Sequence, residues 1–312
     1  MRRVLVTGAT GFIGRQCLPL LTARGYEVHA VSREVAAMKA PGIAWHRGDL
    51  LQPGCGGALI GRLRPDCVLH LAWHAEPGEF WETPKNIEWL RASLEMLSAF
   101  VRSGGKRLVA AGSCAEYDCS GGECTEDETR LLPATLYGTS KHTLERVVHS
   151  FTRQGGLSSA WGRIFYLYGP HEHPSRLVAY VVRSLLQGQP ALCSDGTQLR
   201  DFLHVEDVAA AFVALLESEV QGPVNIGSGV PVTVSSLLQQ IGQQIGRPEL
   251  LRLGARDASG EAPRVWANIR RLAEEVGWTP RYDLSEGIAR TIEWWRQSAG
   301  VLQGPASGGT AP

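Results

Sequence analysis

The sequence predicts an α/β fold built on a doubly wound parallel sheet. Two observations support this prediction: strand-like and helix-like segments alternate through the first half of the chain, and a glycine-rich turn joins the first strand to the first helix. The predicted strands cover residues 4–7, 26–32, 67–72, 107–111 and 159–167, and the predicted helices cover 12–24, 87–102 and 136–152. Repeated βαβ units of this kind produce parallel strands with helices on both faces of the sheet.

The glycine-rich turn places Gly8, Gly11 and Gly14 at intervals of three, between the first strand and the first helix. Glycines there let the backbone approach a pyrophosphate, while the helix start offers N–H groups and the positive end of its dipole. The alternative is an ordinary tight turn. We therefore predict a Rossmann-type dinucleotide site, with cofactor contacts from Gly8, Thr10, Gly11, Phe12, Ile13 and Gly14.

The end of the second strand favours NADP(H) as the cofactor, with NAD(H) as the alternative. An acidic residue at this place would bind the adenosine ribose hydroxyls and repel a 2′-phosphate, whereas this chain has Ser32 and Arg33. A guanidinium forms charge-assisted bonds to phosphate; the alternative is that Arg33 only stacks on adenine or points to water. Further along, Asp49 and Leu50 are candidates for adenine contacts, unless Asp49 only caps its loop.

The chain is expected to divide into two parts and a tail. Residues 1–168 form the predicted Rossmann domain, to which residues 204–228 return with a helix over 205–217 and a strand over 224–226. Residues 169–297 form mainly a smaller C-terminal substrate-binding lobe with helices over 177–187, 234–246 and 288–297, and the segment 195–204 has few apolar residues. Residues 298–312 are predicted to be a disordered tail.

Composition excludes several classes of protein. Charges balance at 31 basic and 31 acidic residues, so no overall field favours nucleic acid or an anionic membrane. No apolar run approaches a membrane span, and we see no secretory signal. The seven cysteines contain no CxxC pair, which predicts a reducing, cytoplasmic home. His74, His171 and His173 lie near strand ends, but no ligand spacing accompanies them, so no metal is predicted.

Tyr137 and Lys141 are the candidate catalytic pair. They stand four residues apart and therefore share one face of the helix over 136–152. We expect the ammonium to lower the pKa of the phenol, which suits a general acid or base near neutral pH. The alternative is an aromatic side chain and a cation on a helix surface. Ser113 follows the strand over 107–111, where its hydroxyl would reach a substrate carbonyl or alcohol.

These motifs resemble the extended short-chain dehydrogenase/reductases, the NAD(P)-dependent nucleotide-sugar epimerase/dehydratase family. The resemblance covers about residues 1–297, and its motifs lie at residues 7–14, 48–50, 70–72, 112–117, 137–141, 168–170, 200–208 and 225–229. It implies a catalytic triad of Ser113, Tyr137 and Lys141, a nucleotide-sugar substrate, and a homodimer formed through residues 87–102 and 136–152. It adds Leu71 and Ala72 to the cofactor contacts.

The same resemblance implies the substrate contacts. Arg200 becomes a clamp on the substrate diphosphate, for which a guanidinium is suited, unless it only forms a salt bridge with Asp201. The full set of implied substrate-binding residues is Ser113, Cys114, Tyr166, His171, Arg200 and Arg264. Tyr166 stands where relatives often have Asn.

Departures from the family pattern narrow the chemistry to hydride transfer. Dehydratases usually carry Asp-Glu after the triad hydroxyl, where this chain has Cys114 and Ala115. The fucose-synthase type uses a Cys and a His where this chain has Ala115 and Arg176. The run 112–117 looks like that of 4-keto-6-deoxyhexose reductases. We therefore expect NADPH-dependent reduction of the 4-keto group of a nucleotide-linked (6-deoxy)hexose, as in deoxysugar biosynthesis.

Two other functions stay open at the level of sequence. A nucleotide-sugar 4-epimerase would use the same triad with tightly bound NAD and would interconvert two sugar nucleotides. A non-catalytic NADP-binding regulator is possible on this fold, but such proteins typically lose the Tyr and the Lys that this chain retains.

Overall fold

A parallel seven-stranded sheet forms the centre of the protein. The structure, a computed structural model, describes residues 2–34, 41–154, 156–257 and 260–302. The strand order is β11-β7-β5-β4-β1-β2-β3, and each neighbouring pair is parallel. The strands are β1 Arg3–Thr7, β2 Glu27–Ser32, β3 Ile43–Arg47, β4 Cys67–His70, β5 Arg107–Ser113, β7 Ser158–Ile164 and β11 Gly222–Ile226. The predicted fold class is confirmed.

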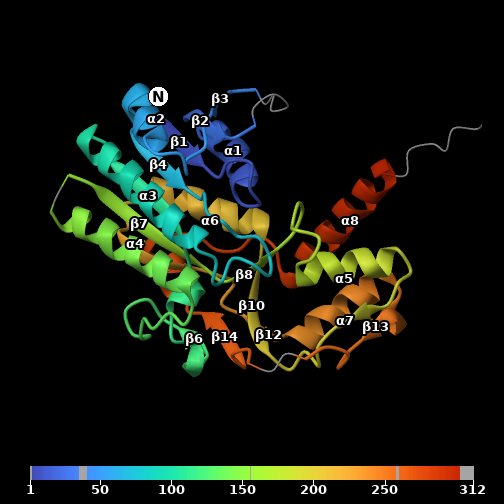
Figure 1. The fold of residues 1–312 in the computed structure, drawn as a ribbon. Helices are drawn as coiled ribbons and strands as arrows, with labels where there is room; N and C mark the ends of the chain where they lie inside the picture. Colours follow the sequence, from blue (N-terminus) through green and yellow to red (C-terminus); the bar gives the residue numbers. More distant parts are fainter. Residues whose placement is uncertain (1, 35–40, 155, 258–259, 303–312) are drawn as a thin grey trace, which may run out of the picture.

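Helices cover both faces of this sheet (Figure 1). They are α1 Gly14–Ala23, α2 Cys55–Leu63, α3 Lys85–Arg102, α4 Leu136–Arg153 and α6 Val205–Glu217. Apolar residues of α1 and α6 pack in one buried cluster, and those of α2, α3 and α4 pack in another. Two separate cores are the consequence of burying both faces of a parallel sheet. All the loops that follow these strands therefore meet at the carboxyl edge.

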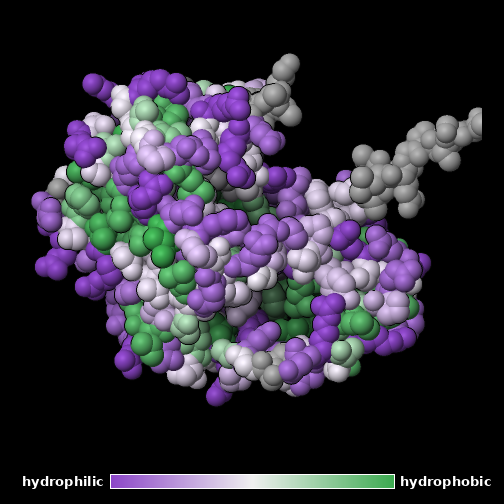
Figure 2. All heavy atoms as spheres, in the orientation of Figure 1, coloured by the Kyte–Doolittle hydropathy of each residue, from purple (hydrophilic) through white to green (hydrophobic). Residues whose placement is uncertain are grey.

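A second, smaller sheet builds the other part of the molecule. Its strand order is β12-β10-β14-β6, with β8 pairing to β10. The strands are β6 Glu123–Cys124, β8 Tyr166–Tyr168, β10 Leu199–His204, β12 Pro231–Thr233 and β14 Arg264–Ala267, and a separate pair is β9 Ala191–Leu192 with β13 Leu251–Arg252. Helices α5 Leu177–Leu186, α7 Val234–Ile245 and α8 Leu284–Leu302 pack against it through a third core. Figure 2 shows a hollow with hydrophobic residues at its floor beside α5.

The structure corrects the strand predicted over 159–167. This segment forms two strands in two different sheets, because β7 pairs with β5 and β11 whereas β8 pairs with β10. The break falls at Phe165, which is buried and donates its backbone N–H to the carbonyl of Ile226. The sequence pattern carries no signal for such a change of partner, because the run of strand-forming residues continues through both halves of the segment.

Other elements were missed or misjudged. Strand β10 lies in the segment with few apolar residues, and its charged Arg200 and Asp201 are buried, which hides the pattern of an ordinary strand. Strand β3 and the glycine-rich helix α2 were also not predicted. Helix α8 runs to Leu302 and so extends into the segment 298–312 that is predicted to be a disordered tail. The rest of that tail, 303–312, lies outside the described residues.

Candidate active site

The glycine turn packs tightly against the end of β4. Gly8 has a φ of +67°, and a Cβ added there would lie 2.7 Å from the backbone nitrogen of Ala72. A Cβ added at Gly14 would overlap the carbonyl oxygen of Gly8. Thr7, just before the turn, also holds the end of β4. Its hydroxyl accepts the Ala72 N–H at 3.3 Å and forms a hydrogen bond with His70 Nδ1 at 2.7 Å. Only glycine fits Gly8 and Gly14 without moving the backbone.

The turn leads into a helix start that is open to an anion. Helix α1 has no side chain capping the amide groups of its first turn. A helix N-terminus without a side-chain cap, next to a glycine turn, is a place where proteins bind a dinucleotide pyrophosphate. Thr10, Gly11, Phe12 and Ile13 form this turn. Leu71 and Ala72 follow β4 directly, and their backbone atoms lie next to Gly8 of this turn.

The residues predicted to select the cofactor lie at the ends of β2 and β3. The Ser32 hydroxyl donates to the carbonyl oxygen of Glu34 at 2.9 Å, and Arg33 is exposed. Asp49 accepts the Leu51 N–H at 3.1 Å, so it does cap its loop through one carboxylate oxygen. Leu50 packs partly against the α2–α3 core. Glu34, an exposed carboxylate two residues beyond the second strand, also lies here and was not predicted as a site residue.

Ser113, Tyr137 and Lys141 come together at the carboxyl edge of the large sheet. Ser113 ends β5, and Tyr137 and Lys141 lie in the first two turns of α4, whose N-cap Thr135 accepts the Gly138 N–H. The Lys141 ammonium donates to the Ala111 carbonyl at 2.8 Å and lies 5.9 Å from the centre of the Tyr137 ring. Ser113 lies close enough to the Tyr137 phenol to lower its pKa. The three functional groups therefore share one site.

Burial, more than mutual attraction, sets the charge states in this site. Burial raises the pKa of Tyr137 above its ordinary value, and the hydrogen bond from Ser113 lowers that pKa only in part. The prediction that the ammonium lowers the pKa of this phenol is therefore wrong for the chain alone. Burial also lowers the pKa of Lys141 to about 7, against a smaller opposing effect of Glu116. Both shifts follow from the cost of holding a charge away from water.

Aromatic residues that sequence analysis missed surround this pair. The Trp73 ring lies 4.0 Å from the Lys141 ammonium, a cation–π contact. Phe80 and Trp81 meet the Tyr137 ring edge-to-face at 4.9 and 5.8 Å, and the Trp81 carbonyl accepts the Tyr137 N–H. The signal in the sequence was the presence of Trp73, Phe80 and Trp81 in the segment that follows β4, because this segment begins at the carboxyl edge of the sheet.

Tyr166 and Arg200 form a second group with Cys114. The Arg200 guanidinium lies 5.2 Å from the centre of the Tyr166 ring and pairs with Glu261 at 3.1 Å. Burial raises the pKa of Cys114, and the nearby Arg200 acts in the opposite direction. The alternative of an Arg200–Asp201 salt bridge is wrong.

The carboxylate of Asp201 has a structural task. It accepts the backbone N–H groups of Ser228, Gly229 and Ala267 at 2.6, 3.0 and 3.1 Å. It therefore holds the turn after β11 against the end of β14, and it leaves the Arg200 guanidinium to other partners.

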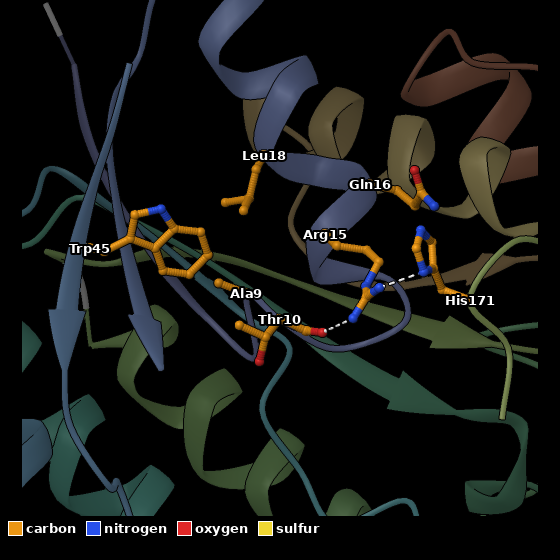
Figure 3. A pocket seen from close by; sticks show the side chains of 7 residues that line it. All are labelled: Ala9, Thr10, Arg15, Gln16, Leu18, Trp45 and His171. Carbon is orange, nitrogen blue, oxygen red and sulfur yellow. Dashed lines mark hydrogen bonds between the residues drawn. The ribbon is translucent and has the colours of Figure 1, made fainter. Parts of the chain in front are cut away.

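His171 lies beside the glycine turn. Its Nδ1 bonds the Arg15 guanidinium at 2.6 Å, and its ring meets Trp294 of α8 at 4.6 Å. Figure 3 shows His171 and Arg15 at one side of a cavity of about 300 Å³, with Trp45 at the other. Arg15 also donates to the carbonyl of Thr10, which ties His171 to the predicted cofactor turn. Arg264, the last predicted substrate contact, is exposed at the start of β14.

Two further searches of the described residues returned nothing. No three His, Cys, Asp or Glu side chains in that part of the chain are grouped as metal ligands. None of its helices combines the length and apolar character that crossing a membrane requires.

Comparison with known proteins decides the family. The sequence profile of the NAD dependent epimerase/dehydratase family matches residues 4–227. The chain belongs to this family. The resemblance predicted from the motifs is thereby confirmed.

Members of the NAD dependent epimerase/dehydratase family match the chain along most of its length. A UDP-glucose 4-epimerase of Rhizobium leguminosarum bv. trifolii is 27% identical, over 95% of this chain and 98% of that protein. A dTDP-glucose 4,6-dehydratase of Streptomyces antibioticus is 28% identical, over 95% of this chain and 92% of that protein. Among solved structures, MoeE5 in complex with UDP-glucose and NAD is 32% identical with a TM-score of 0.82, over 95% and 99% of the two chains. The protein is thus an enzyme of the epimerase/dehydratase family.

Proposed function

We propose that the protein reduces the 4-keto group of a nucleotide-linked (6-deoxy)hexose with NADPH. The observation that carries this proposal is the meeting of a hydroxyl, a phenol and an ammonium, those of Ser113, Tyr137 and Lys141, at the carboxyl edge of the sheet. This group of side chains follows β5, and the glycine turn follows β1. Only β4 lies between these two strands in the sheet. Ligands of open parallel sheets bind at this edge.

In this proposal each member of the triad has one task. NADPH, when bound, supplies the hydride to C4 of the sugar. Ser113 donates a hydrogen bond to the carbonyl oxygen, and Tyr137 delivers the proton that turns that oxygen into a hydroxyl. The raised pKa of Tyr137 supports this direction, because the phenol keeps its proton at neutral pH. Lys141 holds the nicotinamide ribose.

The cofactor preference rests on Arg33. Its exposed guanidinium at the end of β2 is free to reach a 2′-phosphate, and the uncapped start of α1 suits the pyrophosphate. Glu34, which the sequence analysis overlooked, argues the other way, since a carboxylate there would favour the ribose hydroxyls of NAD. The choice between NADPH and NADH is therefore part of the test.

The substrate class rests on Arg200, Tyr166 and Cys114. We propose that Arg200, buried and already turned toward Tyr166, binds the substrate diphosphate, with His171 and Arg264 as further contacts. Cys114 and Ala115 lack the acid and base that removal of water would need. This departure supports simple hydride transfer over dehydration.

A 4-epimerase is the second candidate function. The observation that favours it is the 32% identity to MoeE5, whose structure holds UDP-glucose and NAD. A 4-epimerase would oxidise and reduce the same carbon with one retained cofactor, whereas a reductase exchanges its cofactor in each turnover.

A substrate scan distinguishes these functions. The purified protein is mixed with nucleotide-linked 4-keto-6-deoxyhexoses or hexoses, and the oxidation of NADPH and of NADH is followed for wild type and Arg33→Ala. We expect oxidation of NADPH with a keto sugar, and a higher KM for NADPH in the variant. Interconversion of two hexoses without added cofactor would instead identify a 4-epimerase. A KM for NADPH no lower than that for NADH in either protein would remove the cofactor assignment.

The proposal also assigns a task to each part of the chain and an oligomeric state to the protein. We propose that residues 1–168 with 204–228 bind the cofactor and that 169–297 bind mainly the sugar nucleotide. We also propose a homodimer formed through α3 and α4, which carry partly exposed apolar residues such as Leu94 and Val147. Light scattering of the purified protein should give the mass of two chains.

A further inference from the structure

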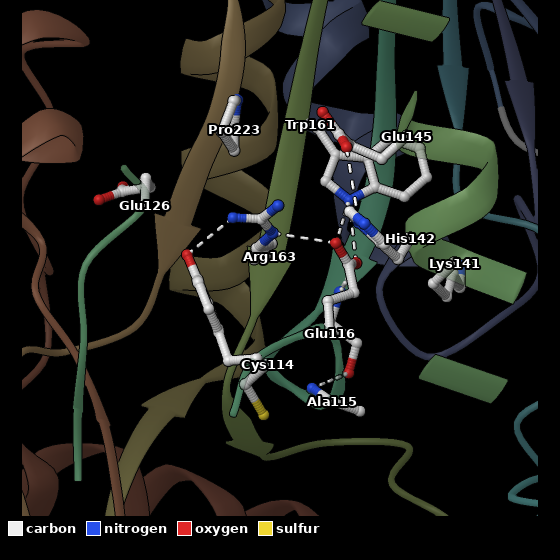
Figure 4. A network of polar contacts seen from close by, with 12 residues as sticks. Cys114, Ala115, Glu116, Glu126, Lys141, His142, Glu145, Trp161, Arg163 and Pro223 are labelled. Atoms are coloured by element: carbon white, nitrogen blue, oxygen red, sulfur yellow. Dashed lines mark hydrogen bonds and ion pairs between the residues drawn. The ribbon is translucent and has the colours of Figure 1, made fainter. Parts of the chain in front are cut away.

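A buried ion pair lies directly beneath the proposed triad. Glu116, in the short helix η1 Cys114–Glu116 after β5, is completely buried, and Arg163 of β7 is 1% exposed. Arg163 Nε donates to Glu116 at 2.9 Å, and Trp161 Nε1 donates to the same carboxylate at 3.0 Å. Figure 4 shows the Glu116 carboxylate turned toward both of these side chains, with Lys141 in the same view.

The Glu116 carboxylate is folded back under the last residues of β5. It accepts the backbone N–H of Ser113 at 2.8 Å, while the Ser113 hydroxyl accepts the N–H of Ala115 at 3.2 Å. Gly112 makes this approach possible, because a Cβ there would lie 2.7 Å from the carboxylate and overlap the Trp161 indole nitrogen. The buried Glu116 carboxylate therefore holds the peptide segment 111–113 in place; we call Glu116 with its partner Arg163 the clamp.

That segment carries two parts of the proposed site. The Ala111 carbonyl accepts a hydrogen bond from the Lys141 ammonium, and Ser113 carries the hydroxyl that lowers the pKa of Tyr137. We propose that Glu116 is a positioning residue that fixes segment 111–113 and thereby holds the Ala111 carbonyl against the Lys141 ammonium. This inference rests on the proposed function, because Ser113 and Lys141 have their catalytic roles only in that proposal.

The charges around Lys141 support an effect of Glu116. His70 of β4 faces the ammonium but is uncharged, since burial lowers its pKa to about 3. Tyr137 of the same helix keeps its proton, and Trp73 offers only a ring. Glu116 is the carboxylate that raises the pKa of Lys141 against the cost of burial. Removing its charge leaves that cost unopposed.

Arg163 is held on its other side, which keeps the pair rigid. Its Nη1 donates to the Tyr117 hydroxyl at 2.9 Å, and that hydroxyl donates to Asn225 of β11 at 2.8 Å. The clamp is thereby anchored in two strands of the large sheet. A buried carboxylate placed by such a network has one orientation, which is what a positioning residue needs.

The test measures the titration of Lys141 directly. The chain contains only four lysines, at 39, 85, 106 and 141, so NMR of protein labelled at the lysine side chains resolves each one. Lys141→Arg assigns the signal. In Glu116→Gln we expect the midpoint of the Lys141 titration to fall by about one pH unit, as expected when one nearby opposite charge is lost. The midpoints of Lys85 and Lys106 should not move.

Glu145→Gln is the matched control. Glu145 is a second buried carboxylate near Arg163, one turn beyond Lys141 on α4, but it is not among the groups that shift the pKa of Lys141. We expect the Lys141 midpoint to stay where it is in this variant. An equal fall in both variants, or no fall in Glu116→Gln, would overturn the proposal.

A further variant protects the test against misfolding. Removing one partner of a buried pair leaves the other charge uncompensated and is strongly destabilising. The double variant Glu116→Gln/Arg163→Met removes both charges, and the same fall in the Lys141 midpoint is expected, because Arg163 is not among the groups that shift Lys141. The titration needs neither substrate nor turnover. An empty substrate scan would thus refute the proposed function and leave this measurement standing.

Discussion

Desolvation controls the ionisable groups of the site at the scale of single residues. Tyr137 and Lys141 are near neighbours, yet burial raises the pKa of the phenol and lowers that of the ammonium to about 7. The phenol is therefore a proton donor at neutral pH, and the ammonium is close to its midpoint. A sequence pattern that places an amine four residues after a phenol cannot report this balance, because it contains no information on the exclusion of water.

Tyr137→Phe tests the proton donor. The change removes the hydroxyl and keeps the ring that packs against Phe80 and Trp81. We expect kcat to fall by about 10²- to 10⁴-fold, as for the loss of a general acid, with little change in the dissociation constant of NADPH. Steady-state kinetics and cofactor titration measure the two quantities. Wild-type turnover in this variant would refute the assigned role.

Lys141→Met tests the cost of burying the ammonium. The pKa of Lys141 is about 7 in the folded chain against an ordinary value of 10.5, so the unfolded chain binds more protons between these values. Wild-type stability should therefore rise with pH across this window, relative to the variant. We expect the variant to melt at a higher temperature than wild type at neutral pH, with a difference that shrinks toward pH 10. Thermal unfolding across this range checks it, and a constant difference would contradict it.

At the scale of elements, two turns at the carboxyl edge make the site. The glycine turn between β1 and α1 lies against β4, and the aromatic segment after β4 covers the start of α4. The first turn depends on missing side chains and the second on large ones. The glycine spacing of the first turn is visible in the sequence. The aromatic residues of the second turn are also visible there, but the sequence does not show that they pack against α4.

Gly14→Ala tests the glycine turn. The added methyl would overlap the Gly8 carbonyl oxygen, so the turn must open. We expect loss of NADPH binding, measured by the quenching or enhancement of cofactor fluorescence. Gly61→Ala in α2 is the control, because a Cβ there meets nothing within 4 Å, and it should stabilise the protein by about 0.5–1 kcal/mol. Unchanged binding in Gly14→Ala would refute this assignment of the turn.

At the scale of the whole molecule, the two sheets are joined through buried polar groups. Asp201 of β10 ties the turn after β11, in the large sheet, to Ala267 of β14, in the small one. Leu203 of β10 also packs in the core formed by α1 and α6, so apolar contacts join the two sheets beside this polar junction.

Asp201→Ala tests this junction. The change leaves the N–H groups of Ser228, Gly229 and Ala267 without their acceptor. Unsatisfied buried donors cost about 1–3 kcal/mol each, so the free energy of unfolding should fall by about 3 kcal/mol or more. Asp195→Ala, which removes an exposed carboxylate bonded only to Thr197, should cost less than about 1 kcal/mol. Denaturant unfolding compares them, and equal losses would refute the structural role of Asp201.

The amino-acid sequence by itself determined the order of the main βαβ units, the glycine turn and the pairing of Tyr137 with Lys141. These features are local: periodicity, a short spacing and a helix face are all readable within a few residues. The family followed from the same motifs. Helix α6 was predicted with the bounds it has, because its apolar stripe is uninterrupted.

Only the tertiary structure decided the rest. It split the segment 159–167 between two sheets, buried the charged strand β10, and gave Arg200 the partner Glu261 in place of Asp201. It also brought Trp73 over Lys141 and Glu116 under Ser113. The physical reason is the same in each case: strand partners, ion pairs and desolvation are set by residues distant in the chain, and no local pattern specifies which of them meet.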